Sequence, residues 1–292
     1  MPDGVQVAKD LSIEEFLSRT YELFKRDFMK YFIIYVVVEA VIGIVATIAA
    51  ASISIPKLPP SPTASQVLSA DLPAIAKQEL VTGLLALVLG TIAVGTAIKI
   101  ASEAIEGRQI DVQEGVRFTA SKILRLWVLG LLVGIIVLLG FIALIVPGII
   151  LAIMLCLAFP VLLIEGKGVT ESMTRSRRLV GGKWLKTFAF FFVLGIIVGV
   201  IGIVGSLIGD LFGPGRTIAT GLISALYSPV VPVGLTVYYY SNVARLTPPA
   251  QPQQAWTQPS TAAPGMKFCP SCGNQLSAGA MFCSKCGARQ PS

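Results

Sequence analysis

Long apolar stretches alternate along this chain with short, basic and amphipathic segments. A helix that crosses the hydrocarbon core of a bilayer needs about 20 mostly apolar residues. Stretches of that kind predict six spans, at about residues 31–51, 80–100, 126–146, 148–164, 188–208 and 217–240. The expected fold is therefore an all-α polytopic membrane bundle of six transmembrane helices over residues 31–246.

The third and fourth spans are inferred from a single run, because no charged residue occurs between Leu126 and Ile164. As one helix, that run would be roughly 58 Å long, nearly twice the thickness of the hydrocarbon core. Proline disfavours the continuation of a helix. We therefore predict a break at Pro147-Gly148 and a tight hairpin of two spans.

Composition and charge agree with a membrane protein and orient it. Of the 292 residues, 54% are hydrophobic and 13% are charged, the second figure being about half that of an ordinary soluble domain. Only Lys57, Lys77 and Arg216, among the 23 Lys and Arg residues, lie in the connections after the first, third and fifth spans. The positive-inside rule then predicts a multi-pass protein of the cell membrane with both termini cytoplasmic.

Three segments, each directly before an odd-numbered span, share one sequence pattern. Residues 13–20, 112–119 and 169–176 read aliphatic, any, Glu, any, aliphatic, any, any, Thr or Ser. The spacing of Ser12 and Glu15, and of Asp111 and Glu114, is that of a capping box, which predicts a helix start. Residues 1–30 form the first cytoplasmic amphipathic segment. A repeated unit of one amphipathic helix and one membrane hairpin explains the pattern, although inside-facing entry helices in general tend towards it.

Glu39 is the one carboxylate well inside a predicted span. An ionisable residue at that depth predicts a proton or cation site, or one half of a buried pair. Tyr35, one turn earlier on the same face, is the candidate partner. A structural hydrogen bond to a neighbouring helix is the alternative.

Proline and glycine interrupt the later spans. Pro160, Pro229 and Pro232 lie in spans 4 and 6, where they predict either simple kinks or broken helices that line a cavity. Span 5 carries a set of glycines that predicts close helix packing: Gly195, Gly199, Gly202, Gly205 and Gly209.

The C-terminal tail contains the sharpest motif. Residues 247–266 are rich in proline and predict a flexible linker. Residues 267–289 then contain two C-x2-C pairs, whose cysteines are Cys269, Cys272, Cys283 and Cys286. Four thiolates complete the tetrahedron that structural Zn²⁺ requires, and the glycine after each pair permits a left-handed turn. Disulfides are the alternative, which a cytoplasmic location disfavours.

Two resemblances follow from these motifs. Residues 267–289 are similar to the short zinc ribbons found at the ends of many prokaryotic proteins, which implies a small β zinc ribbon. The aromatic stripe Phe16–Phe28, the turn at residues 146–150 and the segment 159–166 resemble the integral-membrane domain fused to some bacterial glycerophosphodiester phosphodiesterases, and its stand-alone relatives. That enzyme's activity is not expected here, because the chain has no histidine and no room for an α/β barrel of about 250 residues.

The sequence supports two functional hypotheses. The first is a membrane scaffold or regulator whose zinc ribbon binds a cytoplasmic protein partner. The second is a transporter or channel for an amphiphile or ion that uses Glu39 and the broken spans 4 and 6. An enzyme is disfavoured, because no cluster of His, Asp or Cys lies at membrane depth. Nucleic acid is disfavoured as a partner, since the ribbon region carries only Lys267, Lys285 and Arg289 as cations. The pattern predicts no particular oligomeric state.

Overall fold

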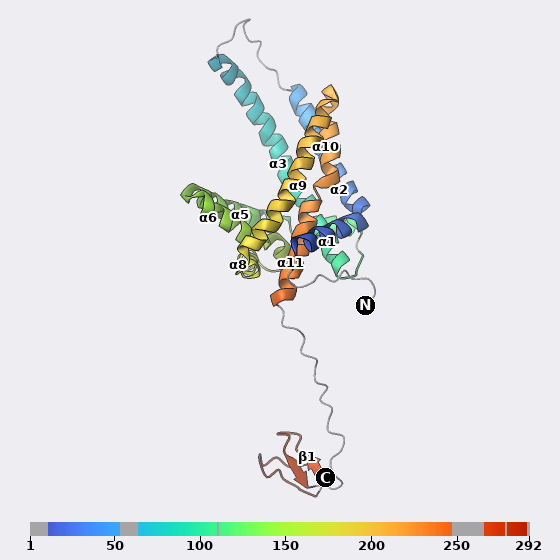
Figure 1. The fold of residues 1–292 in the computed structure, drawn as a ribbon, viewed down its shortest axis with the longest axis vertical. Helices are drawn as coiled ribbons and strands as arrows, with labels where there is room; N and C mark the ends of the chain where they lie inside the picture. The colour runs from blue at the N-terminus through green and yellow to red at the C-terminus, as the bar shows by residue number, and fades with distance from the viewer. Residues whose placement is uncertain (1–10, 53–63, 110, 247–265, 278, 291–292) are drawn as a thin grey trace. The chain divides into compact units, whose positions relative to one another are not determined.

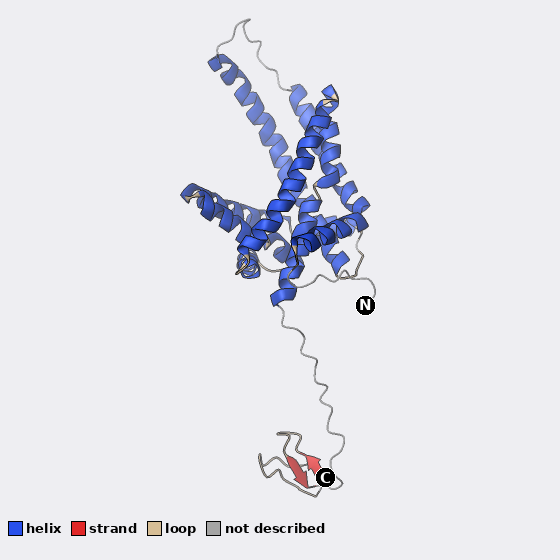
Figure 2. Cartoon of the chain, in the orientation of Figure 1, coloured by secondary structure: helices blue, strands red, loops and turns tan. Residues whose placement is uncertain are grey.

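The computed structural model describes residues 11–52, 64–109, 111–246, 266–277 and 279–290. The chain divides into two compact units, Met1–Thr247 and Pro248–Ser292, called here the membrane unit and the ribbon unit. Residues 247–265 of the linker predicted at 247–266 and the Lys57 position lie outside the described residues, whereas Met266 begins a strand. Figure 2 shows helices in the membrane unit and strands in the ribbon unit.

The membrane unit contains eleven α-helices within the described residues (Figure 1). They are α1 (Ile13–Arg26), α2 (Phe28–Ser52), α3 (Ala64–Ile105), α4 (Val112–Ser121), α5 (Ile123–Ala143), α6 (Ile145–Leu155), α7 (Ala158–Pro160), α8 (Val169–Val180), α9 (Trp184–Asp210), α10 (Arg216–Tyr227) and α11 (Val230–Leu246). A π-helical turn, η1 (Val161–Glu165), follows α7, and a short 3-10 turn, η2 (Gly213–Gly215), precedes α10.

Six helical stretches of the described chain are long and apolar enough to cross a membrane. They are Phe28–Ile48, Leu80–Ile105, Ile123–Ala143, Ile145–Glu165, Trp184–Asp210 and Ile218–Leu246. The predicted helical fold with six spans is therefore confirmed. Helix α2 packs against α3 and α10, and α10 packs against α9, while α5 and α6 form a hairpin of their own (Figure 1).

The break between spans 3 and 4 lies earlier than predicted. Helix α5 ends at Ala143, and Leu144 adopts an extended conformation with φ −167° and ψ 153°. Pro147 then lies in the first turn of α6, where a residue without an N–H group leaves no hydrogen bond unmade. The prediction of a break at Pro147-Gly148 is wrong for this reason. Close approach at Gly140 and Gly148 permits the tight hairpin, since a Cβ at Gly140 would lie 2.9 Å from the Gly148 Cα.

A side chain of the next described helix, α8, forms hydrogen bonds with the backbone at the break in span 4. Pro160 has no N–H group to continue the helix, and α6 ends at Leu155, five residues before Pro160. The Ser176 hydroxyl of α8 accepts a hydrogen bond from the Leu157 N–H at 3.2 Å and donates one to the Met154 carbonyl at 2.8 Å. These bonds satisfy backbone groups that the kink releases, so the break serves helix packing.

The three segments that share the sequence pattern form α1, α4 and α8, which we call the entry helices. In α1 the capping box is complete, with Glu15 N–H donating to the Ser12 hydroxyl at 3.2 Å and Ser12 N–H donating to the Glu15 carboxylate at 2.7 Å. The Ser12 backbone N–H accordingly lowers the pKa of Glu15. The predicted box at the start of α4 is wrong, because Asp111 makes no side-chain capping bond.

Equivalent positions of the entry helices are buried in equivalent places. The final residue of each pattern, Thr20, Thr119 or Ser176, is at most 2% exposed. Each packs against the second span of the preceding unit, since α4 contacts α3, α8 contacts α6, and α1 contacts α11 of the last unit. The three units thus contact one another head to tail and close into a ring. This arrangement supports a true internal repeat.

The second spans of the three units meet at their C-terminal ends. Glu106 and Glu165 each directly precede a glycine with positive φ, Gly107 at 75° and Gly166 at 66°. The Tyr239 hydroxyl of α11 donates to Glu165 Oε1 at 2.9 Å, and the neighbouring Tyr240 hydroxyl donates to Glu106. These hydrogen bonds join the ends of spans 2, 4 and 6.

Replacing Gly95 of α3 with Ala is expected to destabilise the membrane unit by about 1–3 kcal/mol, because the added methyl overpacks a close contact. An ideal Cβ at Gly95 would lie 2.3 Å from Thr119 Cγ2, and a hydrogen bond to the Gly115 carbonyl at 3.0 Å holds the Thr119 side chain in place. Unfolding of the detergent-solubilised protein measures the effect. Gly90→Ala in the same helix is the control, because its Cβ meets nothing within 4 Å. Equal stability of the two variants would contradict the proposed packing.

The ribbon unit contains a short antiparallel sheet of β1 (Met266–Phe268) and β2 (Gln275–Ser277). Lys267 pairs with Leu276 in the centre of this sheet, and an isolated bridge joins Phe282 to Arg289. Its buried apolar cluster consists of Cys269, Leu276 and Cys283. A core of this size cannot stabilise a domain alone. The ribbon unit therefore requires an additional stabilising element, such as a bound metal or disulfides.

Candidate metal centre and intramembrane cavity

Two backbone turns present the four tail cysteines. The Gly273 N–H donates to the Cys269 carbonyl and the Gly287 N–H to the Cys283 carbonyl, both at 2.9 Å. Both glycines have a φ of 71°, a backbone conformation that residues with a side chain rarely adopt. The left-handed turns predicted from the sequence are confirmed. Each turn brings the two sulfurs of one C-x2-C pair to the same side.

The sulfur positions fit a single tetrahedral ion. The Sγ atoms of Cys269, Cys272, Cys283 and Cys286 all lie within 4.8 Å of one another. Cys269 and Cys286, and likewise Cys272 and Cys283, have their sulfurs 3.6 Å apart. Metal–sulfur bonds of about 2.3 Å in a tetrahedron place neighbouring sulfurs about 3.8 Å apart. The four cysteines therefore form a metal-binding site whose four positions are all supplied by protein.

Nearby N–H groups favour the thiolate form, which a metal needs, at Cys269 and Cys283. Burial acts to raise the pKa of the Cys269 thiol, but the backbone N–H groups of Ser271 and Cys272 outweigh it and lower the pKa to about 6. The Cys286 and Lys285 N–H groups lower the pKa of Cys283. Gln290 adds a side-chain donor, with its Nε2 lying 3.4 Å from Cys269 Sγ. The sequence motif did not identify Gln290, which lies beyond the predicted ribbon.

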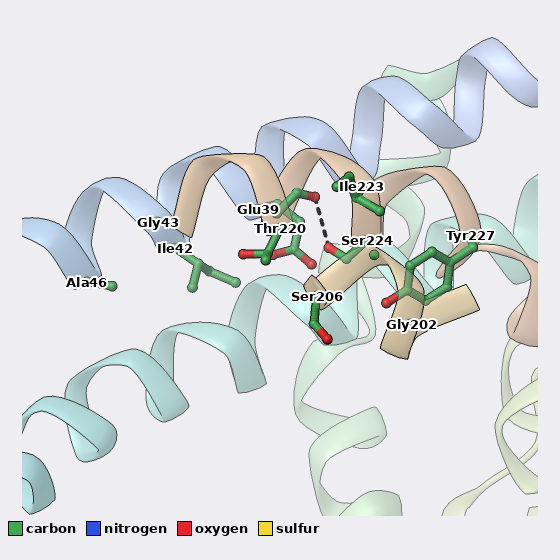
Figure 3. Close-up of a pocket in the computed structure, with 12 residues that line it drawn as sticks. Glu39, Ile42, Gly43, Ala46, Gly202, Ser206, Thr220, Ile223, Ser224 and Tyr227 are labelled. Carbon is green, nitrogen blue, oxygen red and sulfur yellow. Dashed lines mark hydrogen bonds between the residues drawn. The ribbon is translucent and has the colours of Figure 1, made fainter. Parts of the chain in front are cut away.

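Glu39 lies at a cavity of about 260 Å³ between α2, α9 and α10 (Figure 3). The lining is made of one carboxylate, hydroxyl-bearing side chains, glycines and a few apolar residues: Glu39, Ile42, Gly43, Ala46, Gly202, Gly205, Ser206, Thr220, Gly221, Ile223, Ser224 and Tyr227. Helix α10 lies against α2 at Gly221, where an added Cβ would make an ordinary van der Waals contact with Glu39 Cβ at 3.5 Å. Ser224 on α10 is the hydrogen-bonding partner of the Glu39 side chain.

The structure corrects the residues predicted to surround Glu39. Tyr35 is buried, but it does not line the cavity, and its hydroxyl has no hydrogen-bond partner among the described residues. No hydrogen bond therefore joins Tyr35 to Glu39 among the described residues, and their pairing stays a prediction. Pro160 is also absent from the lining, so span 4 does not contribute to this site. Span 6 contributes its first half, α10, which ends at Tyr227 just before Pro229.

The glycines of span 5 explain why α10 can lie so close to α9. A Cβ would lie 2.6 Å from Ile223 Cγ2 at Gly205 and 2.2 Å from Thr220 Cγ2 at Gly209. The predicted packing role is confirmed at these positions, whereas nothing lies within 4 Å of a Cβ at Gly195 or Gly199. The sequence pattern did not identify four of the cavity residues, namely Ser206, Thr220, Ser224 and Tyr227. Spacing of four residues between Thr220 and Ser224 places both hydroxyls on one helical face, which was the available signal.

Comparison with known proteins identifies two parts of the chain. The model of a zinc-ribbon domain matches residues 268–290, in agreement with the cysteine geometry. No curated protein and no solved structure matches the chain. The model of an uncharacterised protein family, UPF0259, matches residues 66–231, more than half of the 292 residues. The chain is thus a multi-span member of the uncharacterised protein family UPF0259 that carries a C-terminal zinc-ribbon domain.

Proposed function

We propose that the protein is a membrane-embedded scaffold or regulator whose ribbon unit binds a cytoplasmic protein. The observation that carries this proposal is the apolar surface of the ribbon unit. Four large side chains are exposed there, at 49% for Met266, 41% for Phe268, 69% for Met281 and 61% for Phe282. Methionine and aromatic side chains are enriched at protein interfaces, and exposed apolar surface on a small domain favours a protein ligand.

Zinc is the ion that the thiolate site fits best. Four cysteine sulfurs in a tetrahedron suit Zn²⁺, and a site with no open position is structural. We therefore assign the ion a role in folding the ribbon and propose no catalytic activity for the chain. Kinship with the membrane domain of glycerophosphodiester phosphodiesterases remains part of this proposal and brings no phosphodiesterase activity with it.

The proposed location is the cell membrane, with both termini cytoplasmic. The basic residues of the entry helices and of the segments around them support this orientation through the positive-inside rule. Two of these basic residues donate hydrogen bonds to helix carbonyls. Arg26 donates to the Ala104 carbonyl at 3.2 Å, and Arg245 donates to the Leu179 carbonyl at 2.7 Å. A cytoplasmic ribbon then has access to soluble proteins.

Deleting residues 267–289 is expected to remove one or more specific cytoplasmic proteins from the set that co-purifies with the chain from native membranes. Quantitative mass spectrometry of cross-linked preparations measures the change. Met281→Ser is the sharper variant, because it removes an exposed side chain that is not a metal ligand. Glu39→Gln is the matched control and should retain the same proteins. Identical sets from the full and shortened chains would contradict the scaffold function.

The Glu39 cavity supports a second function, binding or transport of an ion. Its volume of about 260 Å³ is smaller than the 300–1,000 Å³ typical of pockets for drug-sized ligands. The cavity therefore favours a small ion over an amphiphile. The polar side chains around Glu39 come from two further helices, α9 and α10, as binding sites between membrane helices commonly require.

A further inference from the structure

Basic side chains gather at the end of span 4, where the chain turns into α8. They line a pocket of about 300 Å³ that contains three cations, one carboxylate and two hydroxyl groups: Lys167, Thr170, Glu171, Thr174, Arg175 and Arg178. The fourth membrane-spanning stretch ends at Glu165, just before Lys167. The pocket, called here the span 4 pocket, therefore belongs to the region where a bilayer presents its headgroups.

One carboxylate, that of Glu165, holds two of these cations in place. Arg175 Nε donates to Glu165 Oε1 at 3.0 Å, and Lys167 Nζ lies 3.3 Å from Oε2 of the same group. The Tyr239 hydroxyl of α11 donates to Oε1 at 2.9 Å and so anchors the carboxylate to span 6. Arginine carries five N–H donors and lysine three. The contacts to Glu165 use one donor of each cation, so further donors of both are left for a ligand.

Arg178 adds a guanidinium group that has no partner. It lies three residues after Arg175, on the same face of α8. The side chain is exposed and forms no hydrogen bond or ion pair within the described part of the chain. Its planar fork of donors matches two oxygens of a phosphate group. The pocket therefore combines two positioned cations with a third that is free to bind an anion.

The matching place at the end of span 2 carries no excess of positive charge. There Arg108 forms ion pairs with Glu103 and Glu106, and Lys99 forms one with Glu103, so two cations face two carboxylates. In the span 4 pocket and its anchor, three cations face two carboxylates, which leaves a net charge of +1. The excess charge is therefore a property of the unit that contains span 4 and not of both units.

We propose that the span 4 pocket binds a phosphate group, with Lys167, Arg175 and Arg178 as hydrogen-bond donors. Its place at the end of a membrane span favours the headgroup of an anionic phospholipid over a soluble phosphate. The net charge of +1 complements a phosphodiester, which carries a single negative charge. This inference goes beyond the scaffold function and involves neither the ribbon unit nor the Glu39 cavity.

Native mass spectrometry of the full chain in detergent micelles tests the proposal, with phosphatidylglycerol or phosphatidylcholine added. The wild type should retain phosphatidylglycerol in preference, because the basic side chains repel the cationic choline group. Arg178→Gln should raise the Kd for phosphatidylglycerol about tenfold, because a charge-assisted hydrogen bond is lost. This variant should fold, since Arg178 is exposed and has no partner among the described residues.

Two further variants distinguish a built site from general attraction between basic residues and lipid. Arg117→Gln on α4 is the matched control, because it removes an exposed cation of an equivalent entry helix outside the pocket, and it should keep the wild-type Kd. Glu171→Gln should lower the Kd, because it removes a negative charge from the lining. The amide at this position can still accept the hydrogen bond that the Gly168 N–H donates to Glu171 at 3.4 Å.

Thermal unfolding in inorganic phosphate without lipid separates a soluble source of the phosphate group from a lipid. A saturable rise in Tm relative to chloride at equal ionic strength, lost in Arg178→Gln, would support the site and assign it to a soluble ligand if phosphatidylglycerol does not bind. Equal phosphatidylglycerol binding by the wild type and Arg178→Gln, without such a rise in Tm, would overturn the proposal. Equal weakening by Arg178→Gln and Arg117→Gln would also overturn it, because general surface charge would then explain the binding.

Discussion

Replacing Cys283 with Ser is expected to abolish zinc binding and unfold the ribbon unit, while the membrane unit stays inserted. Structural zinc sites of this type contribute about 10–16 kcal/mol of binding free energy at neutral pH, and most of it is folding free energy. Without the metal, the ribbon is stabilised only by two strands of three residues each and a buried cluster of three side chains, which cannot supply that free energy. The serine hydroxyl can still accept the hydrogen bond that the Lys285 N–H donates to Cys283 Sγ at 3.4 Å, so the loss of the metal ligand is what unfolds the ribbon.

Metal analysis and limited proteolysis of the purified full chain measure this effect. The wild type should contain one zinc ion per chain, and the Cys283→Ser variant should contain none and be cut in the tail. Cys156→Ser is the matched control, because this cysteine lies in span 4 and outside the sulfur cluster. A Cys283→Ser protein that retains both zinc and protease resistance would show that the proposed ligand set is wrong.

The spans were predictable because their signal is local and depends on length. An apolar run of about 20 residues identifies a membrane helix without knowledge of its neighbours. The exact break between spans 3 and 4 was not predictable from proline alone. Proline disfavours the helix before it but is accepted in the first turn of the helix that contains it, so Pro147 marks a start rather than a break.

The neighbours of Glu39 depend on contacts that the sequence pattern does not encode. Periodicity places Tyr35 on the same face of α2, but the Tyr35 hydroxyl makes no hydrogen bond to Glu39 among the described residues. The partner, Ser224, lies on a helix far along the chain, and its position depends on the glycines of α9 that let α10 pack closely against α9. Helix pairing of this kind is a tertiary property and outweighs the local pattern.

The metal centre was the most predictable site, since its geometry is set by residues close in sequence. Two residues between thiols and a following glycine suffice to define each turn. The Gln290 donor was missed because it joins the site through the bridge between Phe282 and Arg289, which brings the end of the ribbon back beside Cys269.

Side-specific labelling tests most directly the claim on which the scaffold function depends, namely that the entry helices face the cytoplasm. Single substitutions Arg178→Cys on α8 and Arg216→Cys at the start of α10 place one reporter on each predicted side. A membrane-impermeant maleimide is applied to intact cells, and mass spectrometry of the labelled peptides distinguishes the reporters from the native cysteines. The orientation proposed here predicts labelling of Arg216→Cys in intact cells and of Arg178→Cys only after permeabilisation. Labelling of Arg178→Cys in intact cells, with Arg216→Cys protected until permeabilisation, would contradict it.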